Sequence, residues 1–268
     1  MPDADPVRPL AGRTALVTGS TSGIGAAIAE RMAAAGANIV LNGFGDVNQI
    51  DTARAKLEAD HGVRAVHIDA DLSQGPQATR LVEEAADTLA PPDILVNNAG
   101  IQHVAPVEDF PPDKWEALIA ICLSAAFYTS AAAIPHMKRQ GWGRIINIAS
   151  AQGKVASPFK SAYNAAKHGI IGFTKSIALE LAETGVTANC ICPGYANTPL
   201  VRGQVADQAR ARGLAEKDVI RDVILAVQPQ RRFVEPEDIG DFAVFLSTDA
   251  GRSFTGAALS QDGGWTAH

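Results

Sequence analysis

The stretch TALVTGSTSGIGAAIAE, residues 14–30, has the pattern of a strand, a tight turn and a helix. Its glycines are Gly19, Gly23 and Gly25, spaced GxxxGxG. Gly19 would let the strand turn sharply, and the other two would let backbone and helix approach a ligand and the strand closely. The new helix offers unpaired N–H groups and a partial positive charge to a pyrophosphate, and the intervening hydroxyls add donors. We therefore expect a dinucleotide site at this turn.

A glycine triplet alone is also compatible with a plain turn, so the rest of the chain must decide. The expected strands are residues 14–19, 38–43, 63–69, 93–99, 143–150, 186–194 and 258–264, and the expected helices are residues 24–36, 50–60, 78–89, 114–140 and 162–183. Because the strands are nearly continuous apolar runs, both faces of each should be covered. The alternation predicts an α/β fold, a Rossmann-like, doubly wound, parallel seven-stranded sheet with helices on both faces.

The chain should form a single domain over residues 12–268, preceded by a polar, proline-rich N-terminal tail over residues 1–11. Residues 195–235 interrupt the alternation with a polar, arginine-rich and helical insertion. Long connections at the carboxyl ends of strands are where α/β proteins carry ligand lids. We expect this insertion to cover the substrate.

Composition excludes several classes of protein. The chain has 268 residues, 47% hydrophobic and 19% charged, with a net charge of −6 and no basic run, which disfavours nucleic acid and anionic membrane as partners. The N-terminus lacks a signal-peptide core, and no apolar run approaches the roughly 20 residues of a membrane span. Three cysteines fit a reducing compartment, so the cytoplasm is the default location. Cys190 and Cys192 lack metal-ligand spacing and should be buried strand residues.

The end of the second strand, NGFGD (42–46), should lie beside the cofactor ribose, so its charges indicate whether NAD or NADP binds. An arginine there would accommodate the 2′-phosphate of NADP. Neither this segment nor GSTSGIG (19–25) contains Lys or Arg. Asp46 comes late and is interpreted as a solvated loop residue. The sequence therefore predicts NAD as cofactor.

Tyr163 and Lys167 lie one helical turn apart in SAYNAAKHG, residues 161–169. Taken alone, the pair is compatible with ordinary amphipathic packing. Lowering a phenol pKa from about 10 to about 8 needs roughly 2.7 kcal/mol. A cation about 5 Å away at an effective dielectric of 20 supplies roughly 3 kcal/mol, against which desolvation acts. The pair could therefore be an acid tuned toward neutral pH.

With these motifs in register, the chain from about residue 12 to its C-terminus resembles the short-chain dehydrogenase/reductase family. The signals are the glycine turn, NNAG at 97–100, Ser150, which lies 13 residues before Tyr163, the Tyr163-x-x-x-Lys167 pair, and PG at 193–194 followed by Thr198. The resemblance implies hydride transfer, with Ser150 orienting the substrate oxygen, Tyr163 as acid/base, and Lys167 lowering its pKa and holding the ribose. It implies cofactor contacts from Gly19, Thr21, Ser22, Gly23, Ile24, Gly25, Phe44, Asp71, Leu72, Asn98, Ala99, Gly100, Tyr163, Lys167, Pro193, Gly194 and Thr198. His168 should point to another helix face.

Within the family, the chain is most similar to members that oxidise (R)-3-hydroxybutyrate to acetoacetate, through segments such as NNAGIQHVAPVEDF (97–110) and VASPFKSAYNAAKHG (155–169). A buried carboxylate needs a cation or several donors, and Lys160 lies three residues before Tyr163. The resemblance implies substrate contacts from Gln102, Ser150, Gln152, Lys160, Tyr195, Gln204 and Trp265, with Trp265 reaching the pocket from a neighbouring subunit of a homotetramer.

Three positions depart from the pattern that the resemblance implies. Cys122 stands where the family has an asparagine whose backbone carbonyl continues a proton relay, Gln152 where a histidine is expected, and Tyr195 where a tryptophan is expected. A glutamine can donate to a carboxylate but cannot titrate. The pocket could therefore admit other short hydroxy or oxo acids.

Two other functions remain open at this point. A 3-oxoacyl thioester reductase of the same family would commonly use NADPH, which the missing cations disfavour. A non-catalytic dinucleotide sensor on the same fold would have been favoured by loss of Tyr163 or Lys167, and both are present.

Overall fold

The computed structural model describes residues 8–267, except the side chains of residues 207, 208 and 210–212. Most of the expected N-terminal tail, residues 1–7, and His268 lie outside the described residues. The strands are β1 (Thr14–Val17), β2 (Asn38–Leu41), β3 (Ala65–His67), β4 (Ile94–Asn97), β5 (Gly143–Ile148), β6 (Val186–Pro193) and β7 (Ala258–Gln261). The helices are α1 (Gly23–Ala34), α2 (Val47–His61), α3 (Gly75–Thr88), α4 (Pro112–Ile119), α5 (Ala125–Gln140), α6 (Ser161–Glu180), α7 (Pro199–Arg212), α8 (Glu216–Val219) and α9 (Pro236–Ser247).

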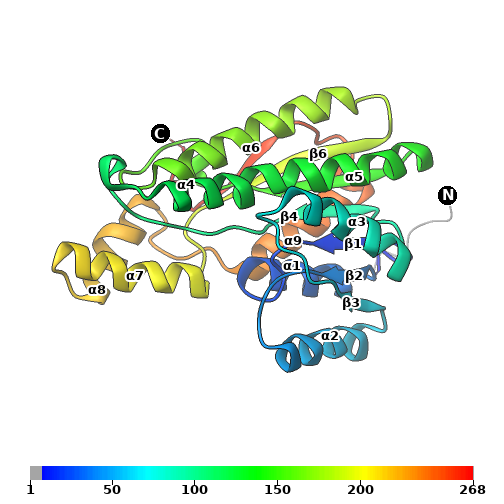
Figure 1. The fold of residues 1–268 in the computed structure, drawn as a ribbon, viewed down its shortest axis with the longest axis horizontal. Coiled ribbons are helices and arrows are strands. Elements are labelled where there is room, and N and C mark those ends of the chain that lie inside the picture. Colours follow the sequence, from blue (N-terminus) through cyan, green and yellow to red (C-terminus); the bar gives the residue numbers. More distant parts are fainter. Residues whose placement is uncertain (1–7, 268) are drawn as a thin grey trace.

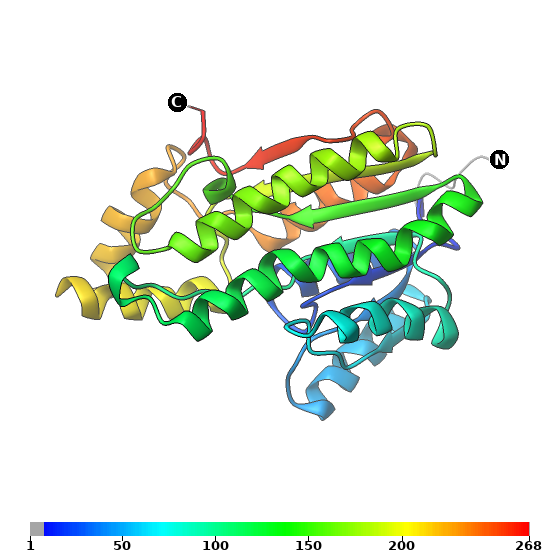
Figure 2. The same cartoon turned by 45° about the horizontal axis from the view of Figure 1, so that its top comes forward.

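All seven strands pair in parallel in the order β3-β2-β1-β4-β5-β6-β7, which confirms the predicted sheet. The winding direction reverses between β1 and β4, and the crevice outside the carboxyl ends of such strands is where α/β folds bind ligands. In Figure 2 the arrows of β5 and β7 point toward the side on which α7 and α8 lie (Figures 1 and 2).

Successive side chains of each central strand pack alternately into two separate cores, one on each face of the sheet. Ala15 and Val17 of β1 face the core formed with α1, α2 and α9, whereas Leu16 faces the core formed with α3, α5 and α6. A strand covered on both faces is apolar at most positions, which is why the runs were readable from the sequence. The two cores fix the sheet rigidly beneath the crevice.

The long helix between β4 and β5 is interrupted where no break was predicted. Residues Ala120–Ser124 form a π-helical turn, η2, between α4 and α5, and the buried Cys122 lies inside it. A π turn inserts one extra residue without a sequence signal of its own, and such turns are frequent at functional sites. Cys122 donates from its thiol to the carbonyl of Ile101, at 3.7 Å between sulfur and oxygen.

The helical run Pro112–Gln140 is long and apolar enough to cross a membrane by length and composition alone. This corrects the expectation that no apolar run approaches that length. In the structure its residues Ala125, Ala133 and Met137 are buried in the core shared with α3, and Ala126 packs beside α6. A core helix meets the same compositional test as a membrane span.

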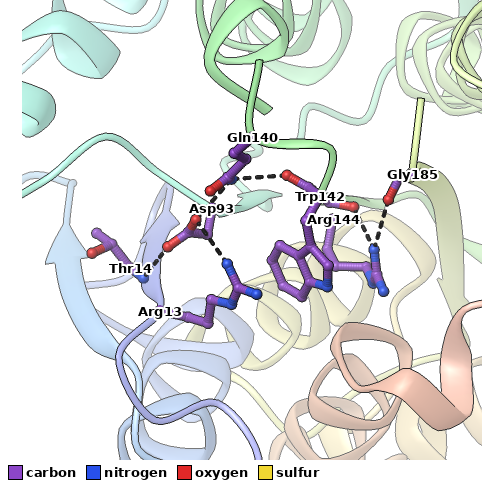
Figure 3. A network of polar contacts seen from close by, with 8 residues as sticks. Arg13, Thr14, Asp93, Gln140, Trp142, Arg144 and Gly185 are labelled. Atoms are coloured by element: carbon purple, nitrogen blue, oxygen red, sulfur yellow. Dashed lines mark hydrogen bonds and ion pairs between the residues drawn. The ribbon is translucent and has the colours of Figure 1, made fainter. Parts of the chain in front are cut away.

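A polar network joins the amino ends of β1, β4 and β5, opposite the crevice (Figure 3). The Trp142 ring lies between two guanidinium groups, with the Cζ atoms of Arg13 and Arg144 at 3.8 and 4.4 Å from its centroid. Asp93 pairs with Arg13 at 3.4 Å and accepts a hydrogen bond of 2.8 Å from Gln140. The network ties β1 to β4 and β5, although β2 and β3 lie between them in the sequence.

Candidate active site

A cavity of about 480 Å³ opens at the carboxyl ends of β1, β4, β5 and β6. Its walls include every residue for which the sequence predicted a catalytic, cofactor or substrate contact, with one exception. The exception is Gly25, which does not line the cavity. A side chain at Gly25 would lie 2.2 Å from the Gly19 carbonyl oxygen, so this glycine serves the close packing of helix on turn.

The glycine turn is built as a phosphate site. Gly19 and Gly23 have φ of +61° and +56°, a region that favours glycine. Ser22, the residue that precedes α1, makes no side-chain hydrogen bond to the helix, so the first N–H groups are left for another acceptor. These groups face the cavity from the first helical turn and suit a pyrophosphate. A nicotinamide dinucleotide fits this cradle.

The NNAG segment supports that turn from β4. The Asn98 side chain donates to the Thr18 and Gly19 carbonyls at 2.9 and 3.1 Å, and the backbone N–H groups of Asn98 and Ala99 donate to the Thr18 hydroxyl at 2.9 and 3.0 Å. Because the Asn98 amide is bonded to the turn, its main contribution is to hold the cradle in shape.

Asn97, the residue before it, begins a buried hydrogen-bonded chain that the sequence did not reveal. Asn97 accepts from Thr129 of α5 at 2.7 Å and donates to Asn147 of β5 at 2.8 Å. Asn147 then donates to Thr174 of α6 at 2.7 Å. Fully satisfied buried networks rigidify what they join, here the two strands and two helices beneath the site.

Ser150, Tyr163 and Lys167 all line the cavity. Ser150 follows β5 in an extended conformation and accepts the Gln152 N–H at 3.1 Å. The Lys167 Nζ atom lies 5.5 Å from the Tyr163 ring centroid and donates to the Ile148 carbonyl at 2.7 Å. His168 lies on the exposed side of α6 and does not line the cavity.

The pKa of Tyr163 is raised overall, whereas the pairing with Lys167 was expected to lower it. Burial raises the pKa of the Tyr163 phenol above its ordinary value, the charge of Lys167 opposes that rise, and hydrogen bonding from Ser150 and Gln102 opposes it further. Desolvation outweighs the cation here because a phenolate loses its hydration in the apolar pocket of Leu118 and Ala162. In the protein alone the phenol is therefore a proton donor near neutral pH.

The far end of the cavity carries a buried cation. Lys160 is 4% exposed, and burial lowers its pKa to about 8. Its ammonium donates to the Gln204 side-chain oxygen of α7 at 3.0 Å and lies 5.3 Å from the Tyr195 ring centroid. Among the described residues, no ion pair involves Lys160. The arrangement suits a small anion.

Two aromatic rings form the wall beside Lys160. Tyr195 stacks on Trp265 with centroids 5.3 Å apart and planes 10° apart, and both line the cavity. Trp265 thus reaches the pocket of its own chain, which corrects the expectation that it comes from a neighbouring subunit. Gln152 donates to the Ser157 hydroxyl at 2.7 Å, and the buried Gln102 oxygen has no partner among the described residues.

The helical character predicted for the insertion over residues 195–235 is confirmed. The insertion contains α7, α8 and the shorter turns η4 (Ile220–Ile224) and η5 (Leu225–Val227). Leu200 and Val201 at the start of α7 line the cavity, although the sequence analysis did not name them. Their position directly after Thr198, the capping residue of α7, was the available signal. Asp46 caps α2 and lies outside the cavity, as expected.

Comparison with known proteins identifies the family of the chain. Residues 13–209 match the family model described as short chain dehydrogenase. The chain is 52% identical over 255 residues to D-beta-hydroxybutyrate dehydrogenase of Rhizobium meliloti (strain 1021), covering 95% of this chain and 99% of that protein. It is 53% identical over 259 residues to the protein of the same name from Cupriavidus necator, covering 96% and 99%. An actinorhodin polyketide ketoreductase variant solved with NADPH superposes with a TM-score of 0.89 at 31% identity, covering 96% and 98%.

Proposed function

The chain belongs to the short-chain dehydrogenase family, and on that premise we propose that it oxidises a short 3-hydroxy acid with NAD, foremost (R)-3-hydroxybutyrate to acetoacetate. Two relatives above 50% identity carry the corresponding name. The observation that carries the proposal is Lys160, a buried ammonium without a carboxylate partner among the described residues, in the same cavity as Tyr163. A substrate with a carboxylate near a hydroxyl satisfies both groups.

The carboxylate binds at the far end of the cavity. Burying an anion requires a cation or several donors, and Lys160 is already held there by a neutral partner. When the carboxylate takes the ammonium, the Gln204 amide is released and its N–H₂ group can donate to the same anion. Gln102 lines the wall and adds a further amide. Gln204 belongs to α7, so the lid contributes directly to recognition.

The reacting oxygen lies between Ser150 and Tyr163. The Ser150 oxygen accepts the Gln152 N–H, so its own hydrogen is available to the substrate oxygen. Tyr163 holds or takes the proton at that oxygen, and Lys167 stabilises the phenolate form by its charge. When bound, the nicotinamide ring supplies the hydride acceptor at its C4. Lys167 keeps hydrogens free for the ribose while one is given to the Ile148 carbonyl.

NAD is favoured over NADP by the charges along the adenosine half of the cavity. The residues after β2 that line it are Asn42, Gly43 and Phe44, none of them charged. The Thr21 hydroxyl donates to the Phe44 carbonyl at 2.9 Å and closes this edge. The two cations that line the cavity, Lys160 and Lys167, are carried by the start and the body of α6 and not by the segment after β2. A 2′-phosphate would therefore lack a counter-charge.

The test is NADH formation at 340 nm with purified protein and a panel of hydroxy acids, each with NAD and with NADP. We expect turnover of (R)-3-hydroxybutyrate with NAD, at a kcat/KM well above that with NADP. Acetoacetyl-CoA reduction faster than acetoacetate reduction would support the rival thioester reductase, since a thioester offers no carboxylate to Lys160. Dinucleotide binding without any turnover would support the sensor. Preference for NADP would overturn the cofactor assignment.

We further propose that the chain assembles as a homotetramer in the cytoplasm. Large apolar side chains remain exposed on neighbouring helices, with Phe127 and Tyr128 of α5 at 53% and 38% and Leu179 of α6 at 81%. Large apolar side chains that remain exposed on adjacent helices are candidates for an association surface. Light scattering coupled to size exclusion measures the assembly, and a monomer would contradict it.

A further inference from the structure

Gln228 is fully buried at the base of the lid, although glutamines are mostly exposed in proteins. It directly follows η5, and its side chain bonds at both ends. The carboxamide oxygen accepts the backbone N–H of Tyr195, and the carboxamide nitrogen donates to the Arg232 carbonyl at 2.6 Å. An N–H requires an acceptor and a carbonyl requires a donor, so the two partners fix the orientation of the amide.

The same residue begins a tightly constrained turn over residues 228–231. Arg231 adopts φ of +53°, unusual for a residue with a side chain, and donates its N–H to the Gln228 carbonyl at 2.8 Å. A side chain at Gly194 would lie 2.3 Å from the Gln228 carboxamide oxygen. Beside this turn, Val234 donates to the Tyr195 carbonyl at 2.9 Å. Gln228 therefore joins the two ends of the lid, where it leaves β6 and where it returns.

Gln228 supports the aromatic wall of the substrate pocket, which Tyr195 and Trp265 form. Its acceptor fixes the backbone of Tyr195, whose ring stacks on Trp265 and faces the Lys160 ammonium. Two residues further on, Gln230 donates to the Gly263 carbonyl at 3.1 Å and draws in the turn that carries Trp265. Both rings of the wall are thus anchored to residues 228–230.

We propose that Gln228 is a positioning residue for the hydroxy-acid pocket, acting through the backbone of Tyr195 to set the distance between the aromatic wall and Lys160. This rests on the proposed function, because the pocket is the one that takes the substrate carboxylate. Gln228 does not line the cavity itself. Its loss should act on the substrate end and spare the glycine turn, which belongs to separate elements of the fold.

Gln228→Met keeps the length of the side chain and removes both hydrogen bonds. We expect KM for the hydroxy acid to rise about tenfold or more, as for an unpaired buried group, while the dissociation constant for NAD changes less than threefold. Gln230→Met is the matched control, because the Gln230 side chain is exposed and its bond to the Gly263 carbonyl is made by the backbone N–H, which the substitution keeps. Wild-type KM for the hydroxy acid in a folded Gln228→Met protein would overturn the proposal.

The pH dependence of kcat/KM for Gln228→Glu distinguishes a positioning role from a merely structural one. A protonated carboxyl can accept and donate as the amide does, whereas the ionised form cannot donate to the Arg232 carbonyl. The ratio of its kcat/KM to that of wild type should be within about threefold at pH 6 and fall at least tenfold by pH 9. The ratio cancels titrations that both proteins share, such as those of Tyr163 and Lys160.

A ratio for Gln228→Glu that stays flat with pH would overturn the proposal, and this outcome decides even if Gln228→Met fails to fold. The comparison uses whichever hydroxy acid the wild type oxidises fastest. A wild type that oxidises none would contradict the proposed function itself. Failure of the positioning role alone would leave the wild type active and the variants unaffected.

Discussion

Replacing Lys160 by methionine should raise the stability of the protein while it removes substrate recognition. Burial lowers the pKa of Lys160 from 10.5 to about 8. At about 1.4 kcal/mol for each pKa unit, the charged ammonium costs the folded state about 3 kcal/mol at pH 7. The hydrogen bond to Gln204 returns about 1 kcal/mol. Lys160→Met should therefore stabilise by about 2 kcal/mol, or about 5 °C in Tm.

The sign of the pH dependence follows from the direction of that shift. Because the folded pKa lies below the unfolded one, the cost is complete below about pH 8 and disappears as the pH rises toward about 10.5. The stability difference between Lys160→Met and wild type should shrink over that interval. Thermal unfolding at a series of pH values measures it.

The same substitution should weaken the substrate complex strongly. A carboxylate about 4 Å from the ammonium gains about 4 kcal/mol at an effective dielectric of 20, and the free enzyme already carries the desolvation cost of the lysine. We expect KM for (R)-3-hydroxybutyrate to rise at least about hundredfold, as measured by absorbance at 340 nm. Lys154→Met is the control, since Lys154 is exposed and donates to the Ser260 hydroxyl. A variant that is less stable than wild type, or that keeps its KM, would refute the reasoning.

Three further outcomes are expected. Tyr163→Phe should lower kcat at least about a thousandfold while fluorescence titration finds NAD affinity within threefold of wild type; substantial residual turnover would contradict the role of Tyr163. Because burial raises the pKa of Tyr163, initial rates of oxidation should keep rising with pH through the mildly alkaline range; a kcat that falls there would be inconsistent. KM for the hydroxy acid should also rise above about pH 8, because Lys160 loses its charge. Asp93→Ala should cost about 2–3 kcal/mol in chemical denaturation, because the Thr14 N–H and Gln140 lose their acceptor, with kcat/KM unchanged; an unchanged stability would argue against the network.

The sheet and the catalytic group were readable from the sequence for physical reasons. A strand such as β1, buried at all four positions, is mostly apolar, because Ala15 and Val17 face one core and Leu16 faces the other. Asn98 directly follows β4 and Ser150 comes two residues after β5. The carboxyl ends of parallel strands meet at one edge of a sheet, so both residues were expected at that edge. Lys160 could be placed near Tyr163 because only three residues separate them.

Features that depend on tertiary packing could not be predicted. Gln228 lies in a polar, arginine-rich segment, where a glutamine is typical of the surface, and its burial depends on how this segment packs against Tyr195 and Arg232. The direction of the Tyr163 pKa shift depends on how much apolar surface covers the ring, a quantity that the spacing to Lys167 does not contain. Trp265 reaches its own pocket through the turn held by Gln230.

The central claim is that this protein holds a carboxylate on Lys160 while Tyr163 exchanges a proton with the neighbouring hydroxyl. The most direct measurement compares kcat/KM of the wild type for (R)-3-hydroxybutyrate and for its methyl ester with NAD at pH 7. The ester keeps the carbinol and the carbon chain but lacks the charge. The claim predicts at least about a hundredfold preference for the acid; an ester that is oxidised as efficiently as the acid would contradict it.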